Sequence, residues 1–171
     1  MNENGKETTE RLTEEAVTSY VRTFLIYRPK GNWHEDGEKE APLSGRGPDL
    51  ILVGGKRSNE YFIIECKGRS YAKTARTANR DGWLNALGLL ITRMDMSCIK
   101  NSEKTKDGKD CTCKYGLGLY WVSAQAALLR IPKDVAKALH LNVFSVYDDG
   151  TVKQWTPKMF GKEYLENDFK E

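Results

Sequence analysis

Apolar residues recur at three- and four-residue steps over residues 9–27, a spacing that predicts an amphipathic helix. Pro29 and Gly31 follow this stretch, and both residue types end helices. The apolar stripe consists of Leu12, Ala16, Val17, Tyr20, Val21, Phe24 and Leu25. We expect this side of the helix to face the core, and we place the start of a first strand at residues 26–33.

A second helix is predicted over residues 72–94 from the same spacing. Its apolar positions are Trp83, Ala86, Leu87, Leu90 and Met94. Trp83, Trp121 and Trp155 are assigned to the core. Trp33 lies in a predicted loop and is our candidate for stacking on a nucleic-acid base.

Between the two helices, the short apolar runs 49–53 and 61–67 flank a glycine-rich turn and predict an antiparallel hairpin. Side chains alternate across a strand, so Glu65 and Lys67 share one face of the second strand. The core side of that strand would hold Phe62, Ile64 and Cys66.

The remaining chain begins with a charged, lysine-rich insertion loop at residues 97–115. We then expect a strand at 117–122, a helix at 131–141 and a hairpin at 143–155, whose turn is Asp149-Gly150. This order of elements predicts an α/β fold in which a mixed central sheet is flanked by helices. A length of 171 residues suits one domain, residues 1–171.

The distribution of charge is more informative than the net charge of +3. Residues 67–80 hold five basic residues and no acidic one, which suits a phosphate backbone, although a solvated helix face has the same composition. The longest apolar runs are far shorter than the roughly 20 residues of a membrane span. The first residues lack the apolar core of a secretory signal, so we expect a cytoplasmic, intracellular protein without membrane contact.

The chain has four cysteines, Cys66, Cys98, Cys111 and Cys113. Their spacing does not match a zinc finger, and a disulfide scaffold is not expected in an intracellular chain of this size. We therefore expect free thiols in the loop 97–115.

Charged residues interrupt the predicted hairpin. Asp49 opens its first strand, and Glu65 and Lys67 lie in its second. A buried charge is costly unless a cation or another partner compensates it, and two neighbouring carboxylates repel each other. Mg²⁺ prefers carboxylate oxygens, backbone carbonyls and waters, and the carbonyl of Cys66 is our candidate for the backbone ligand. Lys67 could then orient an attacking water and stabilise the transition state.

The segments Pro48-Asp49 and Glu65-Cys66-Lys67, each next to or within an apolar strand, resemble the motif of the PD-(D/E)xK nuclease superfamily. That superfamily includes restriction endonucleases and Holliday-junction resolvases. The resemblance implies a restriction-endonuclease-like αβα sandwich and metal-dependent hydrolysis of DNA phosphodiesters. It also implies Asp49 and Glu65 as metal ligands and Lys67 as the catalytic lysine, with Mg²⁺ or, in its place, Mn²⁺.

Many members of that superfamily also carry a glutamate on the first helix. Glu10, Glu14 and Glu15 are the candidates, and Glu14 is chosen because it lies at the edge of the apolar stripe. The alternative is that these acids stabilise the helix N-terminus. Some branches carry a glutamine or tyrosine on the helix after the lysine, and no glutamine is found there.

Basic residues after the motif predict the path of DNA. Lys73, Arg76 and Arg80 recur at i, i+3 and i+7 and form one stripe on the second helix, which we place with Arg69 along a DNA strand. A homodimer is expected, because small resolvases and restriction enzymes usually pair two sites.

Three alternatives stay open. The fold can serve a nucleic-acid-binding module without catalysis. It can serve a homodimeric interaction protein that uses the apolar side of the Trp83 helix. Lys67 can also form a purely structural ion pair with one carboxylate.

Overall fold

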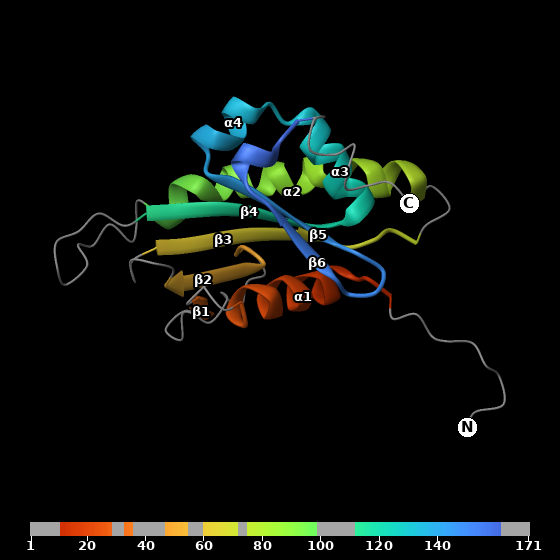
Figure 1. The fold of residues 1–171 in the computed structure, drawn as a ribbon, viewed down its shortest axis with the longest axis horizontal. Coiled ribbons are helices and arrows are strands. Elements are labelled where there is room, and N and C mark those ends of the chain that lie inside the picture. The colour runs from red at the N-terminus through yellow and green to blue at the C-terminus, as the bar shows by residue number, and fades with distance from the viewer. Residues whose placement is uncertain are drawn as a thin grey trace, which may run out of the picture.

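A computed structural model gives the fold for residues 11–28, 33–35, 47–54, 60–71, 75–98 and 112–161. Its centre is a six-stranded mixed sheet with the strand order β1-β2-β3-β4-β5-β6 (Figure 1). The pairs β1/β2, β2/β3 and β5/β6 are antiparallel, and the pairs β3/β4 and β4/β5 are parallel. The strands are β1 Trp33–Glu35, β2 Leu50–Gly54, β3 Glu60–Lys67, β4 Thr112–Tyr120, β5 Leu141–Val146 and β6 Val152–Trp155.

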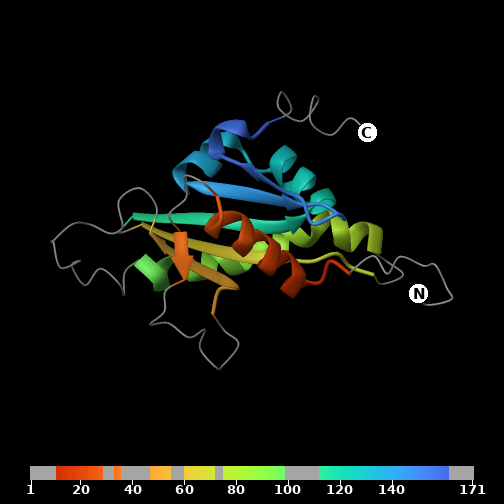
Figure 2. The same ribbon diagram turned by 60° about the horizontal axis from the view of Figure 1, so that its bottom comes forward.

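Helices cover both faces of this sheet. The first, α1 (Glu14–Ile26), packs on one face, and α2 (Ala75–Cys98), α3 (Trp121–Arg130) and α4 (Lys133–Ala138) pack on the other (Figures 1 and 2). A short 3-10 helix, η2 (Pro157–Met159), packs against α4. The expected mixed sheet flanked by helices is confirmed.

The first helix follows its apolar stripe, with Val17, Val21 and Leu25 buried against the sheet. It begins later than the predicted residue 9, because the Thr13 hydroxyl accepts a hydrogen bond from the backbone N–H of Ala16 at 3.2 Å. Such a side-chain cap satisfies one of the free N–H groups of the first turn and fixes where the helix starts.

The hairpin of β2 and β3 is confirmed, with Leu50 opposite Ile64. Its alternation is confirmed as well. The side chains facing α1 are Leu50, Leu52, Phe62, Ile64 and Cys66, whereas Ile63 packs on the opposite side against α2. Because one face of β3 belongs to each core cluster, a slip of one residue would exchange the two sets of side chains.

The segment after the hairpin differs from the prediction. The strand predicted at 117–122 is the longer β4, and the chain turns directly into α3, which the apolar spacing did not reveal. Two glycines explain the close packing of β4. A Cβ at Gly116 would lie 3.0 Å from the Phe144 ring, and one at Gly118 would lie 2.6 Å from the Cys66 sulfur. Strand β4 therefore packs closely only without side chains at these two positions.

The boundaries of two predicted elements, the loop 97–115 and the helix 131–141, differ from those in the structure. Helix α2 continues to Cys98, so part of the predicted loop 97–115 is helix, and β4 takes residues from its other end. Helix α4 is shorter than the predicted 131–141 at both ends. Pro132 is its N-cap and Leu139 its C-cap, and His140, with a φ of 48°, has left the helical conformation. The hairpin of β5 and β6 is confirmed.

The predicted burial of the tryptophans is confirmed at two positions, and the predicted exposure of a third differs from the structure. Trp83 and Trp155 are buried, as predicted. Trp33 is not in the predicted loop from which it was our candidate for stacking on a base. It lies in β1 with 9% of its surface exposed, and its ring packs against Phe62 with 5.3 Å between the centroids. The burial of Trp83 also rules out its side of α2 as a surface for dimerisation.

Among the cysteines whose side chains the structure describes, Cys66 and Cys113, one differs from the prediction. Cys113 is disulfide-bonded, so the expectation of free thiols is wrong there, whereas Cys66 is free and buried. Over the described part of the chain, a search for helices with the length and apolar character of a membrane span finds none.

Candidate active site

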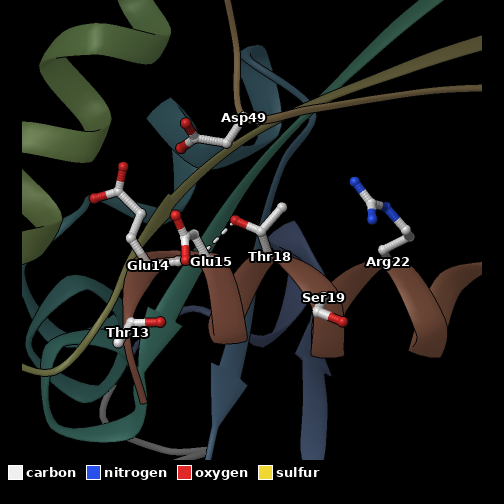
Figure 3. Close-up of a pocket in the computed structure, with 7 residues that line it drawn as sticks. All are labelled: Thr13, Glu14, Glu15, Thr18, Ser19, Arg22 and Asp49. Atoms are coloured by element: carbon white, nitrogen blue, oxygen red, sulfur yellow. Dashed lines mark hydrogen bonds between the residues drawn. The ribbon is translucent and has the colours of Figure 1, made fainter. Parts of the chain in front are cut away.

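An open pocket of about 650 Å³ lies beside the first turns of α1. It is lined by Thr13, Glu14, Glu15, Thr18, Ser19, Arg22 and Asp49. Figure 3 shows Asp49 reaching from the chain before β2 toward α1, where Glu14, Glu15 and Thr18 lie on the facing side. Asp49 and Glu14, two of the three acidic residues expected at the metal site, therefore share one pocket, and Glu15 joins them, whereas the third, Glu65, is not among the residues that line it.

Asp49 is fixed by the neighbouring strand. Its Oδ2 accepts a hydrogen bond from the backbone N–H of Cys66 at 2.6 Å. Burial raises the pKa of the Asp49 carboxyl, and the charge of Glu14 raises it further, while the Cys66 N–H, Lys67 and Arg93 act in the lowering direction. The group is thus held in a position where its charged form is unfavourable without more positive charge.

Lys67 and Glu14 form an ion pair across two elements, Lys67 Nζ with Glu14 Oε2. The pair depends on the close approach of α1 to the end of β3. The backbone N–H of Arg69 donates to the carbonyl of Leu12 at 2.7 Å. A Cβ at Gly68 would lie 2.5 Å from the backbone nitrogen of Glu14, so only glycine lets the two backbones meet here.

Gly68→Ala is therefore expected to lower the free energy of unfolding by about 3 kcal/mol, the upper range of overpacking costs. The clashing atoms belong to the backbone of residues 12–14 and cannot move aside as a side chain does. Gly88→Ala is the matched control, since a Cβ at this position of α2 meets nothing within 4 Å. It should stabilise the protein by about 0.5–1 kcal/mol. Urea unfolding of both variants measures the difference, and equal effects would contradict the close approach.

Glu65 lies on the other face of β3, where it pairs with Arg93 of α2. The Glu65 side chain is 1% exposed and the Arg93 side chain 16%. Glu65 and Lys67 share this face as predicted, because a Cβ at Gly82 of α2 would lie 4.0 Å from the Lys67 Cβ. Arg93 also lowers the pKa of Asp49. Its guanidinium therefore favours the charged form of one predicted metal ligand, Asp49, and forms an ion pair with the other, Glu65.

Arg93 was missed by the sequence analysis, although a signal was present. It lies three residues after Leu90 and ten after Trp83, which places it on the buried side of α2. A basic residue within an apolar stripe indicates a buried acidic partner.

Cys66 offers only its backbone to the pocket. Its side chain is fully buried among the α1-facing residues, and burial raises the pKa of the thiol to about 12. The thiol is therefore protonated at neutral pH and is not a metal ligand. The carbonyl of Cys66 as a ligand stays a prediction.

The residues predicted to bind DNA lie on two surfaces. Arg69 pairs with Asp148 at 2.8 Å, and its guanidinium lies 5.1 Å from the centre of the Tyr120 ring. Arg76 and Arg80 are exposed on the first half of α2. Lys73 lies outside the described residues.

The charge of Asp49 gives a pH dependence of stability. The pKa of the Asp49 carboxyl in the folded protein is raised above the ordinary 3.8. The protonated carboxyl therefore favours folding below pH 3.8, and this contribution to stability is lost as the pH rises through the folded-state pKa. Asp49→Asn keeps a hydrogen-bond acceptor for Cys66 and removes the charge. In EDTA at pH 7 this variant should have a higher Tm than the parent protein, and the gap should narrow as the pH approaches 4. A gap that widens on acidification would contradict the raised pKa.

Within the described residues, no three His, Cys, Asp or Glu side chains form a group that could hold a metal ion. Mg²⁺ needs less than such a cage, since it keeps several waters and is bound by one or two carboxylates together with substrate phosphates. Glu14 and Asp49 line one pocket, and Glu14 is also paired with Lys67. Comparisons with protein-family models, with curated proteins and with solved structures find no match.

Proposed function

We propose that this protein is a metal-dependent endonuclease that hydrolyses DNA phosphodiester bonds, with a restriction-endonuclease-like αβα core of the PD-(D/E)xK type. The observation that carries the proposal is the convergence of Glu14, Asp49 and Lys67. They come from α1, the start of β2 and the end of β3, and they meet beside one open pocket. The resemblance of the surrounding sequence supports the same assignment.

Glu14 and Asp49 would hold the metal ion, with the Cys66 carbonyl as a further ligand expected from the motif. Glu65, the other ligand expected from the motif, is buried and paired with Arg93, so it would bind the ion only after leaving that pair. The donor set fits, because it consists of hard oxygen ligands. A bound Mg²⁺ or Mn²⁺ supplies Lewis-acid activation of the phosphate and a lowered pKa of bound water. A cation would also relieve the unfavourable charge that raises the pKa of Asp49.

Lys67 would orient the attacking water and bind a phosphate oxygen. An ammonium group has three N–H donors, and the ion pair with Glu14 uses one of them. Asp49 in turn is oriented by the Cys66 N–H, which leaves its second oxygen for the pocket. The protein would thus hold the Lys67 ammonium and the Asp49 carboxylate in position before substrate binds.

A DNA cleavage assay tests the proposal. Supercoiled plasmid, linear duplex, four-way junction and single-stranded DNA are incubated with the protein and Mg²⁺ or Mn²⁺, with EDTA as the blank. We expect cleavage of at least one substrate that EDTA abolishes. The Asp49→Asn protein, purified in the same way, controls for contaminating nucleases. Cleavage that persists equally in this variant, or no cleavage of any substrate, would overturn the proposal.

A second candidate is a nucleic-acid-binding module without catalysis. It is favoured by the ion pairs Glu14–Lys67 and Glu65–Arg93, which balance the acidic side chains without a metal. The two candidates differ in one result. The binding module predicts salt-sensitive DNA binding that is unchanged by Asp49→Asn, together with no cleavage by the parent protein.

A homodimer belongs to the nuclease proposal, because cutting both strands of a duplex uses two sites related by two-fold symmetry. The side of α2 that carries Trp83 is buried in the core. The large apolar residues exposed on α2 are Leu84, Leu89 and Ile91, and these are the candidates for such a contact. Light scattering with and without DNA measures the state.

A further inference from the structure

A second pocket, of about 400 Å³, lies between α2 and α3 on the side of the sheet opposite α1. The two helices run side by side (Figure 1). The pocket is lined by Arg76, Thr77, Arg80, Val122, Gln125, Ala126, Leu129 and Arg130. The pocket therefore combines three arginines with the apolar side chains of Val122, Ala126 and Leu129, and the Gln125 amide of α3 adds a polar group. Its volume is in the range of small-ligand sites.

Two of the three arginines, Arg80 and Arg130, bind the same carboxylate. Asp81 accepts hydrogen bonds from Arg80 Nε at 3.0 Å and from Arg80 Nη2 at 3.1 Å, and from Arg130 Nη1 at 3.3 Å. One guanidinium from each helix therefore contacts the same carboxylate, which brings the two groups near each other. With Arg76, the three positive charges exceed the single negative charge of Asp81. Fixing the groups before a ligand arrives lowers the entropic cost of binding it.

Helix α2, which forms one side of the pocket, also packs over the strand that carries Lys67. A Cβ at Gly82 would be 4.0 Å from the Lys67 Cβ and 3.3 Å from Ser123 Oγ. The same serine hydroxyl accepts a hydrogen bond from the backbone N–H of Trp83 at 2.8 Å and ties α2 to α3. Asp81, which binds Arg80 and Arg130, immediately precedes Gly82 in α2.

We propose that this α2/α3 pocket binds one nucleotide of the DNA substrate, with its phosphate at Arg80 and Arg130 and its base against Leu129. Guanidinium groups bind phosphate oxygens in a bidentate manner. The 46% exposed Leu129 side chain offers an apolar surface to a base, and Gln125 can hydrogen-bond a base edge. The inference rests on the proposed function for the identity of the ligand, and it adds Arg130, Gln125 and Leu129 to the predicted DNA contacts.

Fluorescence anisotropy with a labelled oligonucleotide, single-stranded and as duplex, tests the pocket. The titrations are run in EDTA at several salt concentrations, so that binding is measured without cleavage. Arg130→Gln should weaken binding about tenfold and reduce the slope of log K against log salt by roughly 0.7–0.9, the value of one lost phosphate contact. Leu129→Ser should weaken binding severalfold without changing the slope, because it removes no charge.

Arg28→Gln is the matched control, because Arg28 is an exposed arginine just after the end of α1, paired with Gln154. Its slope should equal that of the parent protein. Gln125→Glu is a second variant that leaves the arginines in place and should weaken binding by adding negative charge. Thermal melting of each variant verifies that it is folded.

The outcomes separate this inference from the proposed function. Cleavage by the parent protein with unchanged salt slopes in Arg130→Gln and unchanged affinity in Gln125→Glu would overturn the pocket and leave the nuclease. Binding that depends on the pocket, without cleavage of any DNA, would support the pocket and remove the nuclease. No DNA binding by the parent protein would overturn the pocket as well.

Discussion

Lys67→Met is expected to lower the rate of DNA cleavage by about 10²–10³, the loss seen when one preorganised donor to a transition state is removed. The ammonium lies at the end of β3 in an ion pair with Glu14, and methionine keeps most of the length of the side chain without its donors. The measurement is the single-turnover rate at saturating protein, which separates chemistry from binding.

Two further measurements decide whether Lys67 acts on the reaction or only on the fold. The affinity for DNA in EDTA should change little, and so should the urea midpoint, because exposed ion pairs contribute about 0–1 kcal/mol. Lys158→Met, at an exposed position of η2, removes the same charge away from the pocket and should cleave normally. A loss of rate that merely follows a loss of stability would point to the structural ion pair.

Arg93→Met is expected to lower the free energy of unfolding by about 3–5 kcal/mol, because removing one partner of a buried ion pair leaves the other charge uncompensated. Glu65 is 1% exposed and cannot turn its carboxylate to water. Glu65→Leu should cost less, since the partly exposed Arg93 can extend its guanidinium to solvent. Urea unfolding in EDTA measures both variants.

The double variant Glu65→Leu/Arg93→Met tests whether the two residues act as a pair. It should be more stable than Arg93→Met alone, because replacing both charges by apolar side chains removes the cost of desolvation. Under the nuclease proposal this stable protein should still fail to cleave DNA, since Glu65 is an expected metal ligand. Additive losses of stability would show that the two side chains are not coupled.

Particular elements show how far the sequence could be followed. The alternation in β3 predicted that Phe62, Ile64 and Cys66 share one buried side, and the stripe of α1 predicted Val17, Val21 and Leu25 as buried. Helix α3 was missed because several of its buried positions are small residues, including Ser123, Ala124 and Ala127, which carry little periodic signal. Trp33 was misplaced because the short strand β1 is stabilised by its pairing with β2 rather than by its own composition.

The candidate site could also be followed in part from the sequence, which indicated four residues but not Arg93. Asp49, Glu65 and Lys67 stood out because they are charged residues next to or within apolar strands, and Glu14 because of its place beside an apolar stripe.

By itself, the sequence determined the mixed sheet, the hairpin and which side chains of its second strand lie on the same side, because backbone periodicity is a local property. Only the tertiary structure decided that Lys67 forms an ion pair with Glu14 and that Arg93 forms one with Glu65. It also decided that three arginines line one pocket between α2 and α3. The partner of a charge depends on which distant segments pack together, and that packing is fixed by features such as the missing Cβ of Gly68, whose consequence appears only when the backbones meet.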